Sequence, residues 1–139
     1  MPSCNADLLA GVPLFAGLSG RELRRIAAVA KPATFADGEL IVEEGQAGGR
    51  FFVVQSGTAR VVQGGRTRAT LGPGSYFGEL SVLDGEPRSA SVLATSPVVT
   101  WSIAEFNFRP LLKENSALAV KLLVALGGRL RAAERSYVS

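Results

Sequence analysis

The chain has 139 residues, 15 Lys or Arg against 12 Asp or Glu, and 47% apolar positions. These values predict a single globular domain over residues 1–139, with a sizeable core. The count of zero His excludes Ser-His-Asp catalysis and His-ligated metal sites. The lone Cys4 excludes an intrachain disulfide and a four-Cys zinc site, and the net charge of +3 is mild.

The termini and apolar runs bear on location. The longest apolar stretch, Leu122–Leu126, is far shorter than the roughly 20 residues that a membrane-spanning helix needs. The first seven residues lack the basic region and apolar core of a secretory signal. The sequence therefore predicts no membrane span and a cytoplasmic location.

The amino-terminal region, about residues 7–31, has the spacing of helices. Apolar residues recur at steps of three and four after Ser19. Ser19 followed by Glu22 forms a capping-box pattern, which predicts a helix start at this point. Pro32 is expected to end this helix.

The middle region, residues 32–103, changes to a period of two and is punctuated by glycines. Short β-branched and aromatic runs separated by turn residues predict many short strands. Gly64-Gly65 is expected to form a hairpin turn. Strands of this length and spacing favour a sandwich, a barrel or a jelly roll.

The carboxyl-terminal region, residues 104–135, returns to helical spacing, with leucines at four-residue steps from Leu118 to Leu130. Gly127-Gly128 interrupts the pattern, and each glycine costs about 1 kcal/mol relative to alanine inside a helix. We expect a bend, a hinge or the end of the helix at this pair.

One segment of the β region, Gly72–Val92, departs from the strand pattern. Its sequence predicts a strand followed by a glycine and one helical turn. A loop would then lead to an arginine at the start of the next strand. Gly78 permits close backbone approach to a ligand, and the turn after it would direct free N–H groups toward an anion. Arg88 can bind a phosphate with two N–H groups, and Glu79 can accept from a sugar hydroxyl.

This segment resembles a known family. Phe77-Gly78-Glu79-Leu80 and Pro87-Arg88-Ser89-Ala90 are similar to the phosphate-binding cassette of cyclic nucleotide-binding domains. The resemblance implies an α+β fold, in which an antiparallel β-roll of about eight strands (a double-stranded jelly roll) lies between amino-terminal helices and carboxyl-terminal helices that act as a lid. The cassette would span residues 77–92.

The resemblance also implies residue roles. Glu79 would receive the ribose 2′-hydroxyl and Arg88 the cyclic phosphate. The Ser89 hydroxyl and backbone N–H groups would complete the phosphate site, apolar residues would pack on the purine, and Arg129 or Leu130 would contact the base from the lid. Val61 and Leu71 are equally well explained as core residues. The implied ligand-binding set is Gly78, Glu79, Leu80, Arg88, Ser89, Ala90, Val61, Leu71 and Arg129.

The resemblance implies a regulatory sensor domain that is not an enzyme and has no cofactor or metal. Ser89 stands where Thr in some relatives favours cyclic GMP, so cyclic AMP is the expected ligand and cyclic GMP the second choice. Ligand binding would draw the carboxyl-terminal helix inward, with Gly127-Gly128 absorbing part of the change.

Alternatives remain open at this point. The chain could be a β-roll interaction domain that does not bind ligand. A cupin-type enzyme conflicts with the absence of His, and direct DNA binding conflicts with the even spread of Lys and Arg. Signalling could pass to an effector protein or through helix-to-helix dimerisation, and the chain could be part of a longer protein.

Overall fold

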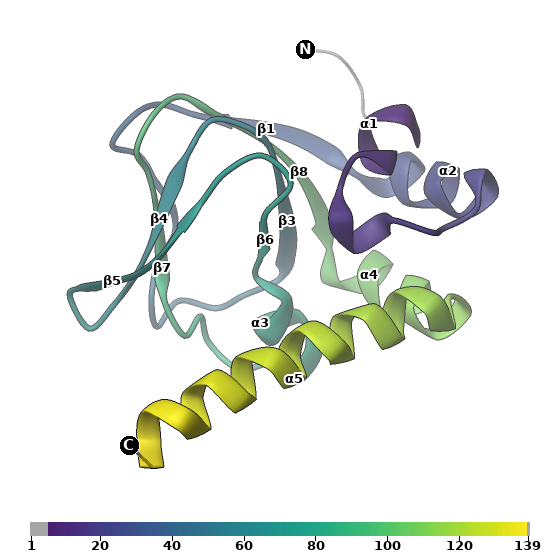
Figure 1. Cartoon of the computed structure of the whole chain (residues 1–139). Coiled ribbons are helices and arrows are strands. Elements are labelled where there is room, and N and C mark those ends of the chain that lie inside the picture. The colour runs from purple at the N-terminus through teal and green to yellow at the C-terminus, as the bar shows by residue number, and fades with distance from the viewer. Residues whose placement is uncertain (1–5, 139) are drawn as a thin grey trace.

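The computed structural model describes residues 6–138, with side chains as far as Glu134. In this part of the chain, eight antiparallel strands form two four-stranded sheets, with helices before and after them (Figure 1). The predicted α+β architecture with an antiparallel β-roll is confirmed. No helix within residues 6–138 is long and apolar enough to cross a membrane.

The two sheets face each other. One has the strand order β1-β8-β3-β6 and the other β2-β7-β4-β5. Apolar side chains fill the space between them, and Phe52 stacks on Phe77 with ring centroids 4.9 Å apart. The strands are β1 (Lys31–Phe35), β2 (Leu40–Val42), β3 (Arg50–Ser56), β4 (Ala59–Gln63), β5 (Arg66–Leu71), β6 (Tyr76–Phe77), β7 (Ser91–Ala94) and β8 (Val98–Ala104).

The predicted turn at Gly64-Gly65 is confirmed. It joins β4 to β5, and both glycines have positive φ, at 58° and 78°. A two-residue hairpin turn of this kind requires that conformation at both positions, and glycine adopts it without a steric cost.

Three short helical segments precede the strands: α1 (Ala6–Ala10), the 3-10 helix η1 (Pro13–Phe15) and α2 (Gly20–Val29). The capping box at the start of α2 is confirmed, since Ser19 Oγ accepts from the Glu22 amide and Glu22 Oε1 accepts from the Ser19 amide. The expected end of this helix before Pro32 is confirmed, since the proline is the second residue after the C-cap, Ala30. The helix ends at Val29, and Pro32 lies in β1, an edge strand where a missing N–H is tolerated.

The remaining helices are α3 (Glu79–Asp84), α4 (Glu105–Glu114) and α5 (Ser116–Val138). A second apolar core joins α4, α5 and the amino-terminal helices to the outer face of β3. Phe51 of β3 stacks on Phe108 of α4 at 4.5 Å, and Leu118 and Leu122 of α5 are buried in the same core. This core fixes the first half of α5 on the body of the domain.

Helix α5 runs without interruption through Gly127-Gly128 (Figure 1). The expectation that the helix could end there is therefore wrong. The first half of the helix is anchored by packing, and tertiary packing outweighs the helix propensity of single residues. Beyond the glycines, α5 passes along one end of the β-roll and closes the cavity described next.

Candidate functional site

A cavity of about 870 Å³ lies between the β2-β7-β4-β5 sheet, α3 and the carboxyl-terminal half of α5. Every residue predicted from the sequence to bind ligand lines it: Val61, Leu71, Gly78, Glu79, Leu80, Arg88, Ser89, Ala90 and Arg129. Leu130, the alternative to Arg129 on the lid, does not line the cavity and is 62% exposed. The structure thus brings together residues that are up to 68 positions apart, from Val61 to Arg129.

Gly78 is required by its surroundings. Its φ of 91° places it in the left-handed region, at the start of α3. A Cβ atom there would lie 2.6 Å from the carbonyl oxygen of Arg50 and 2.6 Å from the Arg88 guanidinium. Only glycine meets both constraints, so α3 can begin directly beside Arg88.

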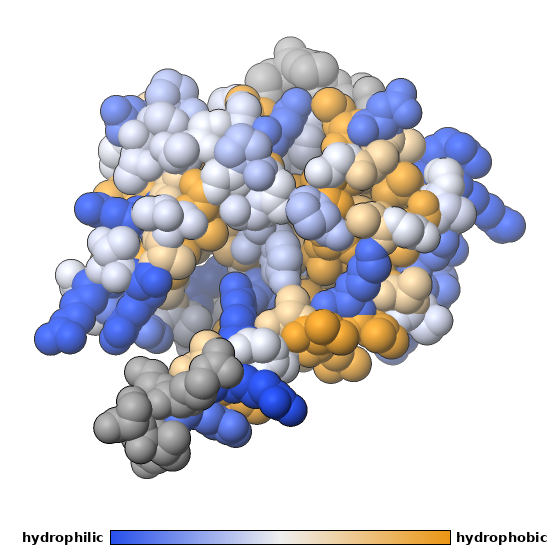
Figure 2. Space-filling model, viewed as in Figure 1, coloured by the Kyte–Doolittle hydropathy of each residue, from blue (hydrophilic) through white to orange (hydrophobic). Residues whose placement is uncertain are grey.

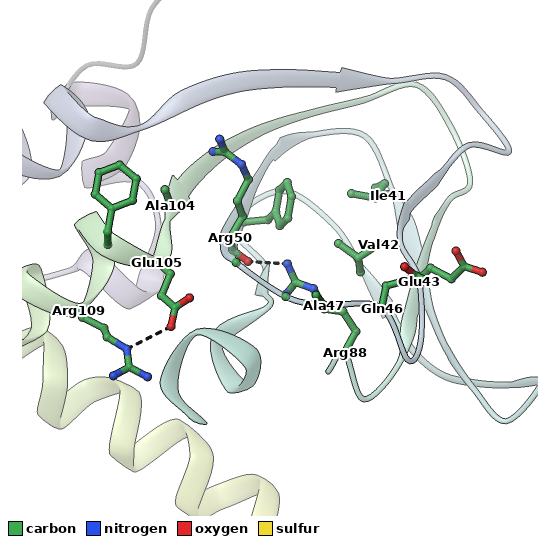
Figure 3. A pocket seen from close by; sticks show the side chains of 14 residues that line it. Ile41, Val42, Glu43, Gln46, Ala47, Arg50, Arg88, Ala104, Glu105 and Arg109 are labelled. Atoms are coloured by element: carbon green, nitrogen blue, oxygen red, sulfur yellow. Dashed lines mark hydrogen bonds and ion pairs between the residues drawn. The ribbon is translucent and has the colours of Figure 1, made fainter. Parts of the chain in front are cut away.

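Arg88 is held by backbone atoms on three sides and is only 8% exposed. Its Nη2 donates to the Arg50 carbonyl at 2.9 Å and its Nη1 to the Gly78 carbonyl at 3.4 Å. Its own amide and carbonyl bond to Gln46 and Gly45 in the loop between β2 and β3. Figure 3 shows the side chain reaching across to the backbone at Arg50.

The charge of Arg88 is only partly compensated. Burial lowers the pKa of its guanidinium, and the nearby Glu79 carboxylate opposes that shift. Within the described part of the chain, no carboxylate forms an ion pair with Arg88. A buried cation bonded only to carbonyl groups favours binding of an anion at the remaining N–H groups.

Glu79 is even more buried, with 2% of its surface exposed. Its Oε1 accepts from Nη1 of Arg129 on α5, which forms an ion pair. Its Oε2 makes no hydrogen bond to a described residue. The carboxylate therefore links α3 to α5 through one oxygen and keeps the other available to accept from a hydroxyl group.

Tyr76 was not predicted from the sequence as a site residue. Its half-buried ring packs against Phe51 at a centroid distance of 5.6 Å and lines the cavity. Burial raises the pKa of its phenol, the Glu79 carboxylate raises it further, and the Arg129 cation opposes both. Tyr76 therefore stays neutral beside the Glu79–Arg129 pair.

The apolar wall of the cavity comes from the sheet. Val61 and Leu71 pack against the core between the sheets and also line the cavity. Their contact with a purine stays a prediction. Strand alternation and helical spacing could have predicted part of the wall, such as Ala132 at three residues after Arg129. Phe77, Ser81 and Val92 belong to the predicted cassette but were not named as ligand-binding residues. The lining residues outside the predicted cassette and ligand-binding set are Val42, Gln63, Arg68, Ala69, Tyr76, Ala132 and Ala133.

A second cavity, of about 920 Å³, lies on the other side of Arg88 (Figure 3). It is bounded by the β2–β3 loop and the start of α4. Two of its charged residues bond locally: Arg109 pairs with Glu105 and also donates to the Val82 and Leu83 carbonyls. Among the predicted site residues, only Arg88 lines it.

Comparison with known proteins agrees with this geometry. The cyclic nucleotide-binding domain family matches residues 32–115, which is more than half of the chain. The chain belongs to this family. The domain is therefore a non-catalytic regulatory domain.

Relatives of this cyclic nucleotide-binding domain include larger regulatory proteins. It is 34% identical over 103 residues to the cAMP-dependent protein kinase regulatory subunit of Yarrowia lipolytica, covering 74% of this chain and 28% of that protein. It is 33% identical over 101 residues to a cGMP-dependent protein kinase of Toxoplasma gondii, covering 72% of this chain and 10% of that protein. The chain therefore spans less than a third of the length of these relatives.

The fold is also similar to solved structures. The catabolite activator protein of Thermus thermophilus superposes with a TM-score of 0.84 at 32% identity, covering 90% of this chain and 61% of that chain. The similarity extends from the strands into the flanking helices, because 90% of the chain takes part.

Proposed function

We propose that this domain is a sensor that binds a cyclic nucleotide, with cyclic AMP as its ligand, in the 870 Å³ cavity. The observation that supports this most directly is Arg88, a buried guanidinium without a carboxylate partner among the described residues, beside the left-handed Gly78. A cyclic phosphate supplies one negative charge and several acceptor oxygens, and it would give the Arg88 guanidinium the anionic partner that the described residues do not provide.

The neighbouring residues suit the rest of the ligand. The hydroxyl of Ser89 and the backbone N–H groups of Gly78, Leu80 and Ala90 would complete the phosphate site. The free Oε2 of Glu79 would accept the ribose 2′-hydroxyl. The purine would then lie on the apolar wall that contains Val61 and Leu71. These roles follow the family pattern, residue by residue.

The preference for cyclic AMP rests on Ser89, which replaces the threonine that favours cyclic GMP in some family members. The printed names of the relatives include both cAMP-dependent and cGMP-dependent kinases, so their names support cyclic nucleotide binding more strongly than either base. A cytoplasmic location and a single domain over residues 1–139 stay predictions.

We propose that α5 transmits the effect of ligand binding to a partner. The ligand hydroxyl and Arg129 would share the Glu79 carboxylate, so ligand binding changes the contact that holds the distal half of α5. The outward side of this helix is apolar, as the orange surface along its middle in Figure 2 shows, with Val120, Leu123 and Val124 at least 56% exposed. An effector protein or a second copy of the chain would bind to that surface. We propose no direct contact with DNA.

Isothermal titration calorimetry tests the proposal. We expect the protein to bind cyclic AMP, and Arg88→Leu to weaken binding by at least 10- to 100-fold, since a charge-assisted bond contributes about 1.5–3 kcal/mol. Arg60→Leu is the matched control because Arg60 is exposed on β4 and does not line the cavity.

The titration also separates the alternatives. No binding of cyclic AMP or cyclic GMP by a protein that circular dichroism shows to be folded would overturn the sensor proposal. The β-roll would then be an interaction domain, and sedimentation velocity would test whether the exposed face of α5 holds two copies together.

A further inference from the structure

The peptide between Ser89 and Ala90 lies just outside the sheet, at the edge of the cavity. Strand β4 pairs with β7 as far as Val62 and Ser91, and the next pair in this register would be Gln63 with Ala90. That pair does not form, because β7 begins at Ser91. The Ser89–Ala90 peptide is therefore not held by the ladder, and other contacts must fix its orientation.

The side chain of Gln63 supplies one such contact. Its Nε2 donates to the Ser89 carbonyl at 2.9 Å. In a trans peptide the carbonyl and the following N–H point in opposite directions, so this bond directs the Ala90 N–H away from Gln63. Ala90 lines the cavity, and its N–H makes no hydrogen bond to a described residue. The N–H is thus oriented by Gln63 and available to a ligand.

Glu44 of the β2–β3 loop holds the end of β4 on which Gln63 lies. Its Oε1 accepts from the Gly64 amide at 3.0 Å, and its own amide donates to Ser91 Oγ at 2.9 Å. Together with the bond from Gln63 to Ser89, these contacts form a closed ring through the hairpin, the loop and the start of β7. Glu44 itself does not line the cavity, so it can affect a ligand only through other residues.

We propose that Gln63 and Glu44 are positioning residues of the phosphate site. Gln63 sets the orientation of the Ser89–Ala90 peptide, and Glu44 keeps Gln63 in place. The inference rests on the proposed function, in which the Ala90 N–H binds the cyclic phosphate. Hydrogen bonds weaken steeply when the donor turns away from the acceptor, so a peptide released by Gln63 would lose this contact.

Calorimetric titration of the whole chain with cyclic AMP tests the role of Gln63. Gln63→Leu keeps the approximate size of the side chain and removes the donor, and Gln63 is exposed, so the core is not disturbed. We expect binding to weaken by about 3- to 10-fold, as for the loss of one hydrogen bond. Thr67→Val is the control, because Thr67 is exposed on β5 outside the cavity, and it should leave the affinity unchanged.

Two phosphorothioate diastereomers of cyclic AMP separate positioning from a general loss. Each carries sulfur, a weak acceptor, in place of one of the two exocyclic oxygens. In one diastereomer the contact with the Ala90 N–H is already weakened, so Gln63→Leu should weaken that ligand less than about twofold and the other as much as cyclic AMP. The Ala90 amide proton gives a direct readout by NMR: cyclic AMP should shift it downfield, and less so in Gln63→Leu.

Two substitutions of Glu44 form a matched pair. Glu44→Leu and Glu44→Gln remove the same charge, but only glutamine keeps an acceptor for the Gly64 amide. Glu44→Leu should therefore bind cyclic AMP about 2- to 3-fold more weakly than Glu44→Gln. In a Gln63→Leu background this difference should vanish, because Glu44 acts through Gln63.

The outcomes are distinct. If the unsubstituted protein binds neither cyclic AMP nor its analogues, the proposed function fails and this inference with it. If it binds cyclic AMP but Gln63→Leu leaves the affinity unchanged, or weakens both diastereomers equally, positioning by Gln63 is overturned while the proposed function stands. A difference between the Glu44 variants that persists without Gln63 would overturn the role of Glu44 alone.

Discussion

The segment from Gly78 to Ala90 and the distal half of α5 border the same cavity but are held in different ways. The segment is fixed by backbone hydrogen bonds at Arg88, by the left-handed Gly78 and by close contacts that leave no room for a Cβ. The distal half of α5 begins at two glycines, where an added Cβ would meet no atom within 4 Å apart from its chain neighbours and the adjacent helix backbone. Its described ion pair to the body of the domain is Arg129 with Glu79.

This difference fits the two tasks of the proposed function. A phosphate site needs donors that are already in place, because ordering them on binding would cost affinity. A reporting element needs a contact that the ligand can change, and one half-exposed ion pair is weak enough to be changed. The following substitutions test whether rigidity and mobility are divided in this way.

The largest effect is expected for Gly78→Ala. The left-handed conformation alone costs an alanine about 1–2 kcal/mol, and the Arg50 carbonyl or Arg88 must also move to admit the new methyl group. Thermal unfolding should show a clear loss of stability, and any folded protein should bind cyclic nucleotide weakly. Unchanged stability and affinity would mean that the segment is not rigid.

A smaller loss is expected for Arg129→Ala, which leaves the buried Glu79 carboxylate without its cation. Removing one member of a fully buried pair costs about 3–5 kcal/mol, but Arg129 is half-exposed, so we expect about 1–2 kcal/mol. Chemical denaturation measures it. In a Glu79→Gln background the loss should nearly vanish, and a persistent loss would assign the effect to helix packing. Arg131→Ala serves as the neutral control.

The opposite sign is expected for Gly128→Ala. The position is helical and open, so alanine should raise stability by about 0.5–1 kcal/mol. Hydrogen exchange of the distal half of α5 should slow as well. A destabilised protein would show that the glycine pair is under a packing constraint.

The smallest effect is a pH dependence. Because the folded protein raises the pKa of Tyr76, it favours the neutral phenol. The stability from this group is complete below pH about 10, the ordinary value for tyrosine, and is lost as pH rises through the higher folded pKa. Between about pH 8 and 11, the free energy of unfolding should fall less steeply with rising pH for Tyr76→Phe than for the unsubstituted protein. Identical pH profiles of the two proteins would contradict the raised pKa of Tyr76.

The same comparison explains what the sequence could predict. The cassette is continuous in the chain, so its glycine, carboxylate and arginine were recognisable together, and their resemblance to the family implied the eight-strand roll. Alternation and turn residues by themselves favoured a sandwich, a barrel or a jelly roll. Arg129 was recognised only as one of two candidates, since the register of a long helix against a cavity depends on packing at its other end.

Other features depend on contacts between distant residues and had no local signal. Pro32 lies in a strand because β1 is at the edge of its sheet, and α5 continues through Gly127-Gly128 because Leu118 and Leu122 anchor it. Arg68 lines the cavity beside a β-bulge in the pairing of β4 with β5, and alternation alone would have directed this side chain away from the cavity.

The continuity of α5 has a mechanical consequence for the proposed signalling. A 23-residue helix is about 35 Å long, so in the proposed function it would act as a lever whose pivot is the core around Leu118 and Leu122. Because the helix has no break at the glycines, a displacement of Arg129 would be passed to this pivot, where α5 contacts α4 and η1. The lever would thereby connect the amino-terminal helices, which lie far from Arg129 in the sequence, to the cavity.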